Sequence, residues 1–330
     1  MVITARSNSS SPKGARPINM NKDLPQVVRL LERVFGESVR DGQQIFSPGG
    51  LADTPAFLWR LNVNMNRLSP GFVWEENGRI VGNVTLLPSR PASRFLVANV
   101  AVHPDYRRRG IARLLMNEVL ADIRQRNGRT ALLQVDKDNT AAVTLYRELG
   151  FESLGHMTHW RTTSTRLRLI QADDAAATWD DPAPSIRPLA NHLWSEAYDL
   201  DRLAVPAAFD WPDVLPANNY KRPWWQRLVD FLNGRHVEVW ATQNQQQQVN
   251  GLAAIYGELG QPHYLKIRVH PDWQGKLERP LLAKLLRRLD YLSRRNIRID
   301  HPDDDETMNK LLREANFTIK RTLTHMRLRL

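Results

Sequence analysis

Residues 102–112 read VHPDYRRRGIA, directly after the apolar stretch FLVANV, and their types suit the binding of an anion. A strand, a short turn containing glycine and the start of a helix place several unpaired backbone N–H groups at one point. The helix dipole adds positive potential there. Gly110 would let the backbone approach the anion, and Ala112 would keep the first helical turn thin. The arginines that could add charge for phosphates are Arg107, Arg108, Arg109 and Arg113. The stretch therefore predicts a polyphosphate-binding turn, and a solvated basic turn is the alternative.

The elements that would position this turn follow from the apolar spacing of the first half of the chain. Helical spacing predicts a helix over residues 23–35, with Asp23 as its N-cap and Pro25 in its first turn. Two apolar runs around Asn77-Gly78 predict a β-hairpin. The remaining predicted elements are a strand over 94–102, a helix over 111–126, a strand over 130–135, and a helix over 139–149 closed by Gly150. This order predicts a mixed α/β sheet.

The chain repeats itself imperfectly, with a period of about 167 residues. Four pairs of segments recur in the same order: ARPINM and SIRPLA, VHPDY and VHPDW, YRELGF and LREANF, and GHMTHWR and LTHMRLR. Such a long period predicts that each copy is a domain. The predicted organisation is a disordered tail over 1–14, a first domain over 15–170, an acidic, Ala- and Pro-rich linker over 171–185, and a second domain over 186–330. The last strand before the linker could pack on either half.

The motifs of the first copy resemble those of the GNAT superfamily of acyl-CoA-dependent acyltransferases, over roughly residues 15–160. One signature of that family is a strand ending in V-x-P, followed by (Q/R)-x-x-G-x-(G/A) at the start of a helix. It is matched by Val102-His103-Pro104 and residues 107–112. A second signature, N-x-x-A-x-x-x-Y followed by G-F, is matched by Asn139, Ala142, Tyr146, Gly150 and Phe151. The resemblance implies tandem GNAT folds, each a mixed, mostly antiparallel twisted sheet flanked by helices, with acetyl-CoA as the acyl donor.

The resemblance also implies roles for particular residues. The backbone of Val100, Ala101 and Val102 would pair with the pantetheine arm, and Asn139 would contact the pantetheine side. The pyrophosphate would lie on the turn and helix start, which comprise Arg107, Arg108, Arg109, Gly110, Ile111, Ala112 and Arg113. Tyr146 would protonate the departing thiolate, unless it is only a core aromatic. An amine would attack the thioester directly, with an N–H near Ala101 polarising its oxygen. No metal site is predicted.

The general base is not evident from the sequence. Family members that acetylate protein N-termini often carry an acid in the strand before the Asn helix, where this chain has Gln134. The candidates for the base are Asp136, Asp138, Glu75, Glu76, His156 and His159, although each such residue is more often solvated or structural than a base. Water relayed to a distant acid would preserve the activity. The acceptor could be a small amine, an aminoglycoside, an amino acid or a protein N-terminus.

The second copy lacks the residues that would bind the cofactor. Leu277 falls where Gly110 stands in the first copy, and Arg279 replaces Ala112. Pro280 removes a further N–H. Glu306 is predicted to lie opposite Asn139, and Leu312 or Arg313 opposite Tyr146. The second half is therefore predicted to be a GNAT-like domain that has lost the cofactor and instead forms a wall of the substrate cleft.

Composition sets limits on the remaining classes of function. Lys plus Arg number 46 against 35 for Asp plus Glu, a formal net charge of +11, and cysteine is absent. A silent acyl-CoA sensor is the main alternative to the enzyme, and a polyanion- or nucleic-acid-binding protein is the less favoured one. The absence of cysteine excludes a cysteine nucleophile and favours a reducing compartment. We expect a cytoplasmic protein without a membrane span, either a monomer with pseudo-dimeric domains or a homodimer.

Overall fold

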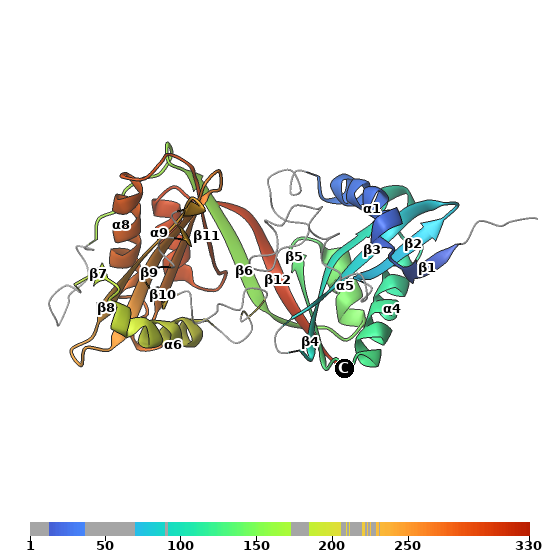
Figure 1. The fold of residues 1–330 in the computed structure, drawn as a ribbon, viewed down its shortest axis with the longest axis horizontal. Coiled ribbons are helices and arrows are strands. Elements are labelled where there is room, and N and C mark those ends of the chain that lie inside the picture. Colours follow the sequence, from blue (N-terminus) through green and yellow to red (C-terminus); the bar gives the residue numbers. More distant parts are fainter. Residues whose placement is uncertain are drawn as a thin grey trace, which may run out of the picture.

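The computed structural model describes residues 13–36, 70–89, 92–172, 185–205, 209, 211, 220–221, 223, 225, 229–230 and 232–330. The strands in these ranges form one twelve-stranded sheet in the order β1-β2-β3-β4-β5-β12-β6-β11-β10-β9-β8-β7 (Figure 1). The two ends of this order correspond, because β1 to β5 and β7 to β11 are the equivalent strands of the two copies. The sheet is mostly antiparallel, with β4–β5 and β10–β11 as its parallel pairs. The predicted fold class, tandem mixed sheets flanked by helices, is confirmed.

The first copy contains the elements that its sequence predicts. Asn77 and Gly78 both have positive φ, 54° and 75°, as a two-residue hairpin turn requires. Gly150, at φ 92°, follows the end of the second signature helix. The elements are β1 (Gly14–Pro17), α1 (Met20–Phe35), β2 (Gly71–Glu76), β3 (Arg79–Pro88), β4 (Arg94–Val102), the 3-10 turn η1 (Pro104–Tyr106), α4 (Ile111–Gln125), β5 (Thr130–Asp136), α5 (Thr140–Glu148) and β6 (Glu152–Thr163).

The second copy repeats this order in the part of it that the structure describes. Its elements are β7 (Arg187–Pro188), η2 (Asn191–Leu193), α6 (Trp194–Ala204), β8 (Arg235–Gln243), β9 (Val249–Glu258), β10 (His263–Val269), η5 (Pro271–Trp273), α8 (Glu278–Leu289), β11 (Asn296–Pro302), α9 (Glu306–Glu314) and β12 (Thr318–Arg329). The repeated VHPD segments adopt the same 3-10 turn in both copies, and a histidine ring nitrogen accepts from the aspartate N–H in each.

The last strands of the two copies are exchanged between the halves. β12 lies between β5 and β6 and pairs with both, whereas β6 also pairs with β11 (Figure 1). Trp160 of β6 therefore belongs to the hydrophobic core of the second half, and Met326 of β12 belongs to that of the first half. Lys137 and Asp303, one from each copy, form an ion pair of 2.7 Å. Each half is thus completed by a strand of the other, an outcome that the sequence leaves open.

Opposite faces of the first half carry different elements. α4 and α5 cover one face, where Leu115, Met116 and Leu133 are buried with the β12 residue Met326. α1 covers part of the other face and contributes Val27, Leu30 and Leu31 to a separate cluster. Trp211, from the second copy, packs on this same face against Leu87, Leu96 and Leu132. For brevity we call the face that carries α1 and Trp211 the α1 face.

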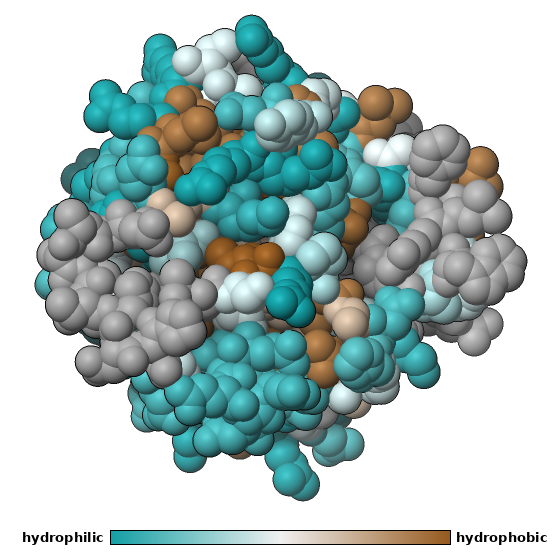
Figure 2. Space-filling model, turned by 90° about the vertical axis from the view of Figure 1, so that its left-hand side faces the viewer, coloured by the Kyte–Doolittle hydropathy of each residue, from teal (hydrophilic) through white to brown (hydrophobic). Residues whose placement is uncertain are grey.

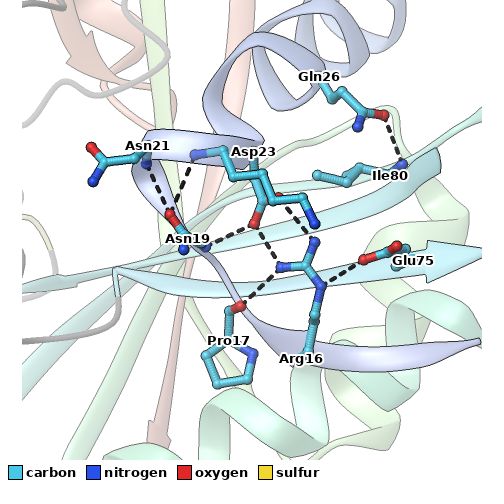
Figure 3. Close-up of polar contacts among 9 residues, drawn as sticks. Arg16, Pro17, Asn19, Asn21, Asp23, Gln26, Glu75 and Ile80 are labelled. Carbon is cyan, nitrogen blue, oxygen red and sulfur yellow. Dashed lines mark hydrogen bonds and ion pairs between the residues drawn. The ribbon is translucent and has the colours of Figure 1, made fainter. Parts of the chain in front are cut away.

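The N-cap of α1 differs from the prediction. Asn19 caps the helix, with its side chain accepting from the N–H groups of Asn21 and Lys22, whereas Asp23 lies one turn inside it. The Asp23 side chain is 1% exposed and accepts from Nη1 and Nη2 of Arg16 at 2.6 and 2.9 Å (Figure 3). Arg16 Nε also binds Glu75 at 2.7 Å. Arg16 therefore ties β1, β2 and α1 together, and this demand on Asp23 outweighs its preference for the N-cap position.

We expect Arg16→Met to lower the free energy of unfolding by about 3 kcal/mol, because it leaves the buried carboxylate of Asp23 without its cation. Urea denaturation at pH 7 would measure the loss. Arg187→Met is the matched control at the equivalent Arg-Pro of the second copy. There, within the described part of the chain, the Arg187 side chain donates only to the Ser185 hydroxyl. Equal loss in both variants would show that the ion pairs of Arg16 contribute nothing.

The pH dependence of this loss has a defined sign. Burial opposes ionisation of Asp23, but hydrogen bonds from Arg16 and Asn19 outweigh it and hold the pKa of the carboxyl below its usual value. Its stabilising contribution is therefore present above the unfolded-state pKa of about 3.9 and is lost as the pH falls through the lower folded-state pKa. The difference between wild type and Arg16→Met should shrink in that acidic window.

The surface at the end of the molecule formed by the second half is mainly hydrophilic, with hydrophobic side chains in separate patches (Figure 2). Within the described ranges, no helix is long and apolar enough to cross a membrane. The same ranges contain no group of three or more His, Asp or Glu side chains that could hold a metal ion.

Candidate functional site

A gap opens between β4 and β5 part of the way along the two strands. Their parallel pairing runs from Arg94–Thr130 to Val97–Leu133 and then stops, while β4 continues to pair with β3 as far as Val102. A β-bulge lies at this point of β4, where Asn99 adopts a φ of 54°. The fully buried Asn83 of β3 holds the bulge by donating from Nδ2 to the Asn99 carbonyl at 2.9 Å. The bulge increases the local bend of β4 and so accompanies its separation from β5.

The edge of β4 that faces the gap is set by the ladder to β3. The N–H of His103 donates to Val81, and alternate residues of an antiparallel strand point their N–H and C=O groups to the same side. Ala101, paired with Asn83, therefore directs its N–H toward β3. Val102 directs its backbone groups toward the gap, and its carbonyl accepts from Arg107 Nε at 3.3 Å. The N–H of Ala101, which the resemblance suggested as the polarising group, therefore does not face the gap.

The turn after β4 leads directly into α4, as predicted. Arg108 and Gly110 both lie in the left-handed region, at φ 61° and 76°, and Gly110 is the N-cap of the helix. In the part of the chain that the structure describes, no side chain caps this helix end. Across the described residues, the N–H groups of residues 108–113 have no hydrogen-bond acceptor. A Cβ added at Gly110 would meet no atom within 4 Å, so open space lies beside this helix start. The arrangement can receive an anion.

The four arginines of the turn have different surroundings. Arg109 stacks over the Tyr106 ring at 4.8 Å and donates to the Asp105 carbonyl at 3.0 Å. Arg113 forms an ion pair with Glu148, which joins α4 to α5. Arg107 binds the Val102 carbonyl, as described above. Among the described residues, Arg108 has no hydrogen bond or ion pair, so it is the most available of the four for a phosphate.

The second signature forms α5, with Asn139 at its start and Tyr146 near its end. Asn139 is the N-cap of α5 and accepts from the Ala142 N–H at 3.2 Å. Tyr146 is 6% exposed in the core under α4, with its ring 5.9 Å from that of Phe151. Burial raises the pKa of the Tyr146 phenol above its ordinary value, so it stays protonated at neutral pH. Its hydroxyl makes no hydrogen bond within the described ranges, which leaves the proton available for a ligand.

The predicted candidates for the base are dispersed. Glu75 and Glu76 lie on β2, two strands away from β4, where they pair with Arg16 and Lys13. His159 binds Asp300 of β11 at 2.6 Å in the second half. His156 contacts the Thr324 hydroxyl at 3.0 Å, and burial followed by the charge of Lys137 lowers its pKa. Asp136 and Asp138 are exposed. Gln134, which stands where the family often has an acid, lies at the point where β4 and β5 separate.

Sequence reasoning missed the residue that contacts Gln134. His325 of β12 lies directly opposite it in the ladder, and the two Nε2 atoms are 3.0 Å apart. The rings of Phe209 and Trp211 lie 4.8 and 4.7 Å from the imidazole. The repeated segment LTHMRLR, which resembles GHMTHWR, contains His325. No short-range sequence feature indicated that the strand formed by this segment would enter the first half.

The equivalent region of the second half is filled by its own side chains. Leu277, which replaces Gly110, is fully buried and packs against Leu281 and Leu282. Glu278 is 3% exposed, and its Oε1 accepts from the Gly275 N–H at 3.0 Å. A carboxylate thus occupies the turn from within the chain. Burial raises the pKa of Glu278, partly offset by its own N–H and that of Gly275.

Two further features separate the second region from the first. The register of β9 with β10 is regular throughout, so β10 lacks the bulge of β4. Asp305 is the N-cap of α9, so it corresponds to Asn139, in place of the predicted Glu306. The difference of one residue arises because the offset between the copies is 167 at the VHPD turn and 166 here. With the same offset, the fully buried Leu312 corresponds to Tyr146.

Three features together define the class of protein. They are a bulged strand that separates from its parallel neighbour, an open helix start beside it, and a sheet built from two copies of the same fold. The class is that of α/β proteins with two GNAT-type folds in one chain. A tandem GNAT protein from the clavulanic acid biosynthesis pathway matches 96% of this chain and 98% of its own, with a TM-score of 0.53 and 16% identity. A GCN5-related N-acetyltransferase from Sphaerobacter thermophilus matches 96% of this chain and 95% of its own, with a TM-score of 0.59 and 16% identity.

Sequence comparison agrees with the fold. Residues 37–151 match the sequence model of the Acetyltransferase (GNAT) family. The [ribosomal protein bS18]-alanine N-acetyltransferase of Escherichia coli strain K12 is 38% identical over 69 residues, which are 21% of this chain and 47% of that protein. The first half of the chain therefore carries the sequence pattern of the GNAT family, and the whole chain has the fold of tandem GNAT proteins. The chain spans about half the length of the curated relatives that it matches.

Proposed function

We propose that the protein is an acetyl-CoA-dependent N-acetyltransferase with a single active site, formed in the first half at the gap between β4 and β5. The observation that carries the proposal is the open N-terminus of α4 beside the bulged edge of β4. The free N–H groups of residues 108–113 can bind the pyrophosphate of the donor, with Arg108 adding charge. The gap-facing backbone of Val100 and Val102 can pair with the pantetheine arm.

The chemistry requires few groups beyond these. The amine attacks the acetyl carbonyl of the thioester, and a gap-facing N–H of β4 stabilises the charge that develops on oxygen. The bond to sulfur then breaks, and the phenol of Tyr146 gives its proton to the departing thiolate. The amine loses its proton to water, and the Tyr146 phenolate takes a proton back from water. Cysteine is absent from the chain, in keeping with direct transfer without a covalent intermediate on a thiol.

The second half supports the proposal of a single site by its contrast with the first. Leu277 and Glu278 fill the turn, β10 is regular, and Leu312 replaces the phenol. A polyphosphate approaching this turn would have to displace a carboxylate that already accepts its N–H. We therefore propose that this half has lost the ability to bind the cofactor. The proposed second domain spans residues 186–330, as the repeat suggests. The described ranges include neither the tail before residue 13 nor most of the linker.

Calorimetric titration of acetyl-CoA tests the proposal directly. We expect one site per chain in the wild type. Two sites would show that the second half binds the donor as well, and absence of binding would contradict the enzyme. Turnover would then be measured as release of the CoA thiol with an alanine-initiated peptide, L-alanine, kanamycin and spermidine. The peptide follows the activity in the name of the E. coli relative. Binding without turnover on any of these amines would favour an acyl-CoA sensor.

A further inference from the structure

We propose that His325, donated by the last strand of the second half, is a positioning residue that orients the amide of Gln134 toward the acceptor amine. This inference depends on the proposed function, because Gln134 acts here at the acetyl-transfer site. It assigns a specific part of that site to the C-terminal strand of the chain.

The placement of Gln134 makes it the natural contact for an acceptor. It is the first residue of β5 after the parallel pairing with β4 ends, and its side chain is half-buried. It shares the α1 face with Leu132, because side chains two residues apart on a strand point to the same side. Gln134 therefore stands on the α1 face, next to the point where the pairing of β4 with β5 ends.

The contact with His325 fixes which end of the amide faces the gap. Gln134 Nε2 can only donate a hydrogen bond, so the His325 Nε2 at 3.0 Å must accept it. Gln134 Oε1, the opposite end of the amide, has no hydrogen-bond donor among the described residues, so it can accept an N–H of the amine. This hydrogen bond would direct the nitrogen lone pair toward the acetyl carbonyl. An amide cannot take up the proton, so the role is positioning.

The surroundings of His325 keep it in the form that this contact requires. The imidazole is 2% exposed between the rings of Phe209 and Trp211. Among the residues that the structure describes, the neighbours that act on its charge are His156 and His159 of the adjacent strand β6. Burial, with these two histidines, lowers the pKa of His325 to about 3, so the ring is neutral at physiological pH. A neutral imidazole that accepts at Nε2 carries its proton on Nδ1, which has no partner among the described residues.

The exchange of strands explains why the second half is needed for this arrangement. Gln134 belongs to β5 of the first copy, whereas His325, Phe209 and Trp211 all belong to the second. The second half thus contributes to the site without binding the cofactor. Deleting residues 187–330 would also remove Met326 from the core of the first half, so point variants give the clearer test.

Kinetics of the full chain provide the first test, using each panel amine that the wild type acetylates. We expect His325→Leu to lower kcat/KM for the amine by roughly 10- to 100-fold, with KM for acetyl-CoA within about twofold of wild type. His325→Gln, which keeps an acceptor atom, should recover part of the loss. Gln134→Leu should show a similar loss, and the double variant should be no worse than either single variant. Additive losses would overturn the proposal.

The matched control is His263→Leu. His263 is also a buried histidine, 1% exposed, but it lies in the second half and contacts the Ser293 carbonyl through Nε2 at 2.9 Å. We expect this variant to lose thermal stability without a change in kcat/KM. An equal kinetic loss in His263→Leu and His325→Leu would show that both act only through stability, which would contradict a positioning role.

Nitrogen-15 spectroscopy of the imidazoles tests the contact independently of any acceptor. With His325 assigned by its absence in His325→Gln, we expect the neutral Nδ1–H tautomer throughout pH 5–8. The Nε2–H tautomer, or titration within that range, would overturn the proposal. If the wild type acetylates no amine, the proposed function fails and the kinetic role fails with it. The spectrum would still decide whether His325 holds Gln134.

Discussion

Gly110→Glu should reduce the affinity for acetyl-CoA by roughly 100-fold or more. The substitution places a carboxylate and a strained backbone at the helix start that is proposed to bind the pyrophosphate. The φ of 76° favours glycine, and the added side chain would extend into the open space beside the turn. Loss of two charge-assisted hydrogen bonds, each worth about 1.5 kcal/mol, already corresponds to about 100-fold in the dissociation constant. Calorimetric titration would measure the change.

Gly275→Glu is the matched control for this substitution. Gly275 lies in the corresponding turn of the second half, with a φ of 81° and no atom within 4 Å of an added Cβ. Both variants therefore carry the same backbone strain and the same added charge. We expect Gly275→Glu to bind acetyl-CoA as tightly as the wild type. A loss of affinity in Gly275→Glu equal to that in Gly110→Glu would place the donor elsewhere or implicate net charge alone. Leu277 is fully buried, so substitution there would test packing and not the turn.

Local features were predictable wherever a short-range physical rule determined them. Asn77 and Gly78 specified the hairpin because both turn positions require positive φ. The apolar stripe of residues 111–126 identified α4, since a helix buries one face. Asp23 was mistaken for the N-cap because its partner, Arg16, lies outside the helix, on strand β1. Asn99 stood within an apolar run, and that signal for a bulge was not used.

The exchange of strands could not be predicted from either copy alone. β6 and β12 come from similar sequences, GHMTHWR and LTHMRLR, so each pattern suits a place beside β5 or beside β11. The choice depends on the packing of Trp160 and Met326 in the two cores and on contacts between the halves, such as the pair of Lys137 and Asp303. The contact of His325 with Gln134 follows from this choice. The part of the proposed site that was missed is therefore the part that depends on distant regions of the chain.

Tyr146→Phe should lower kcat by roughly 100-fold or more, while the affinity for acetyl-CoA changes little. General acid catalysis typically contributes a factor of about 10² to 10⁴, and phenylalanine removes the proton donor while keeping the buried ring. The ring packs in the core beside Phe151, so the substitution should preserve the fold. Steady-state kinetics and calorimetry together would separate the effect on the chemical step from the effect on binding.

Tyr220→Phe is the control, because Tyr220 is likewise buried but donates to Asp201 in the second half, where no catalysis is proposed. We expect it to retain the wild-type kcat. The pH profile gives a second test. Burial raises the pKa of Tyr146 above the ordinary value of about 10, so the phenol remains protonated and kcat should not fall on the alkaline side below about pH 10. A wild-type kcat retained in Tyr146→Phe would show that the thiolate leaves unprotonated or takes its proton from water, and Tyr146 would then be only a core aromatic.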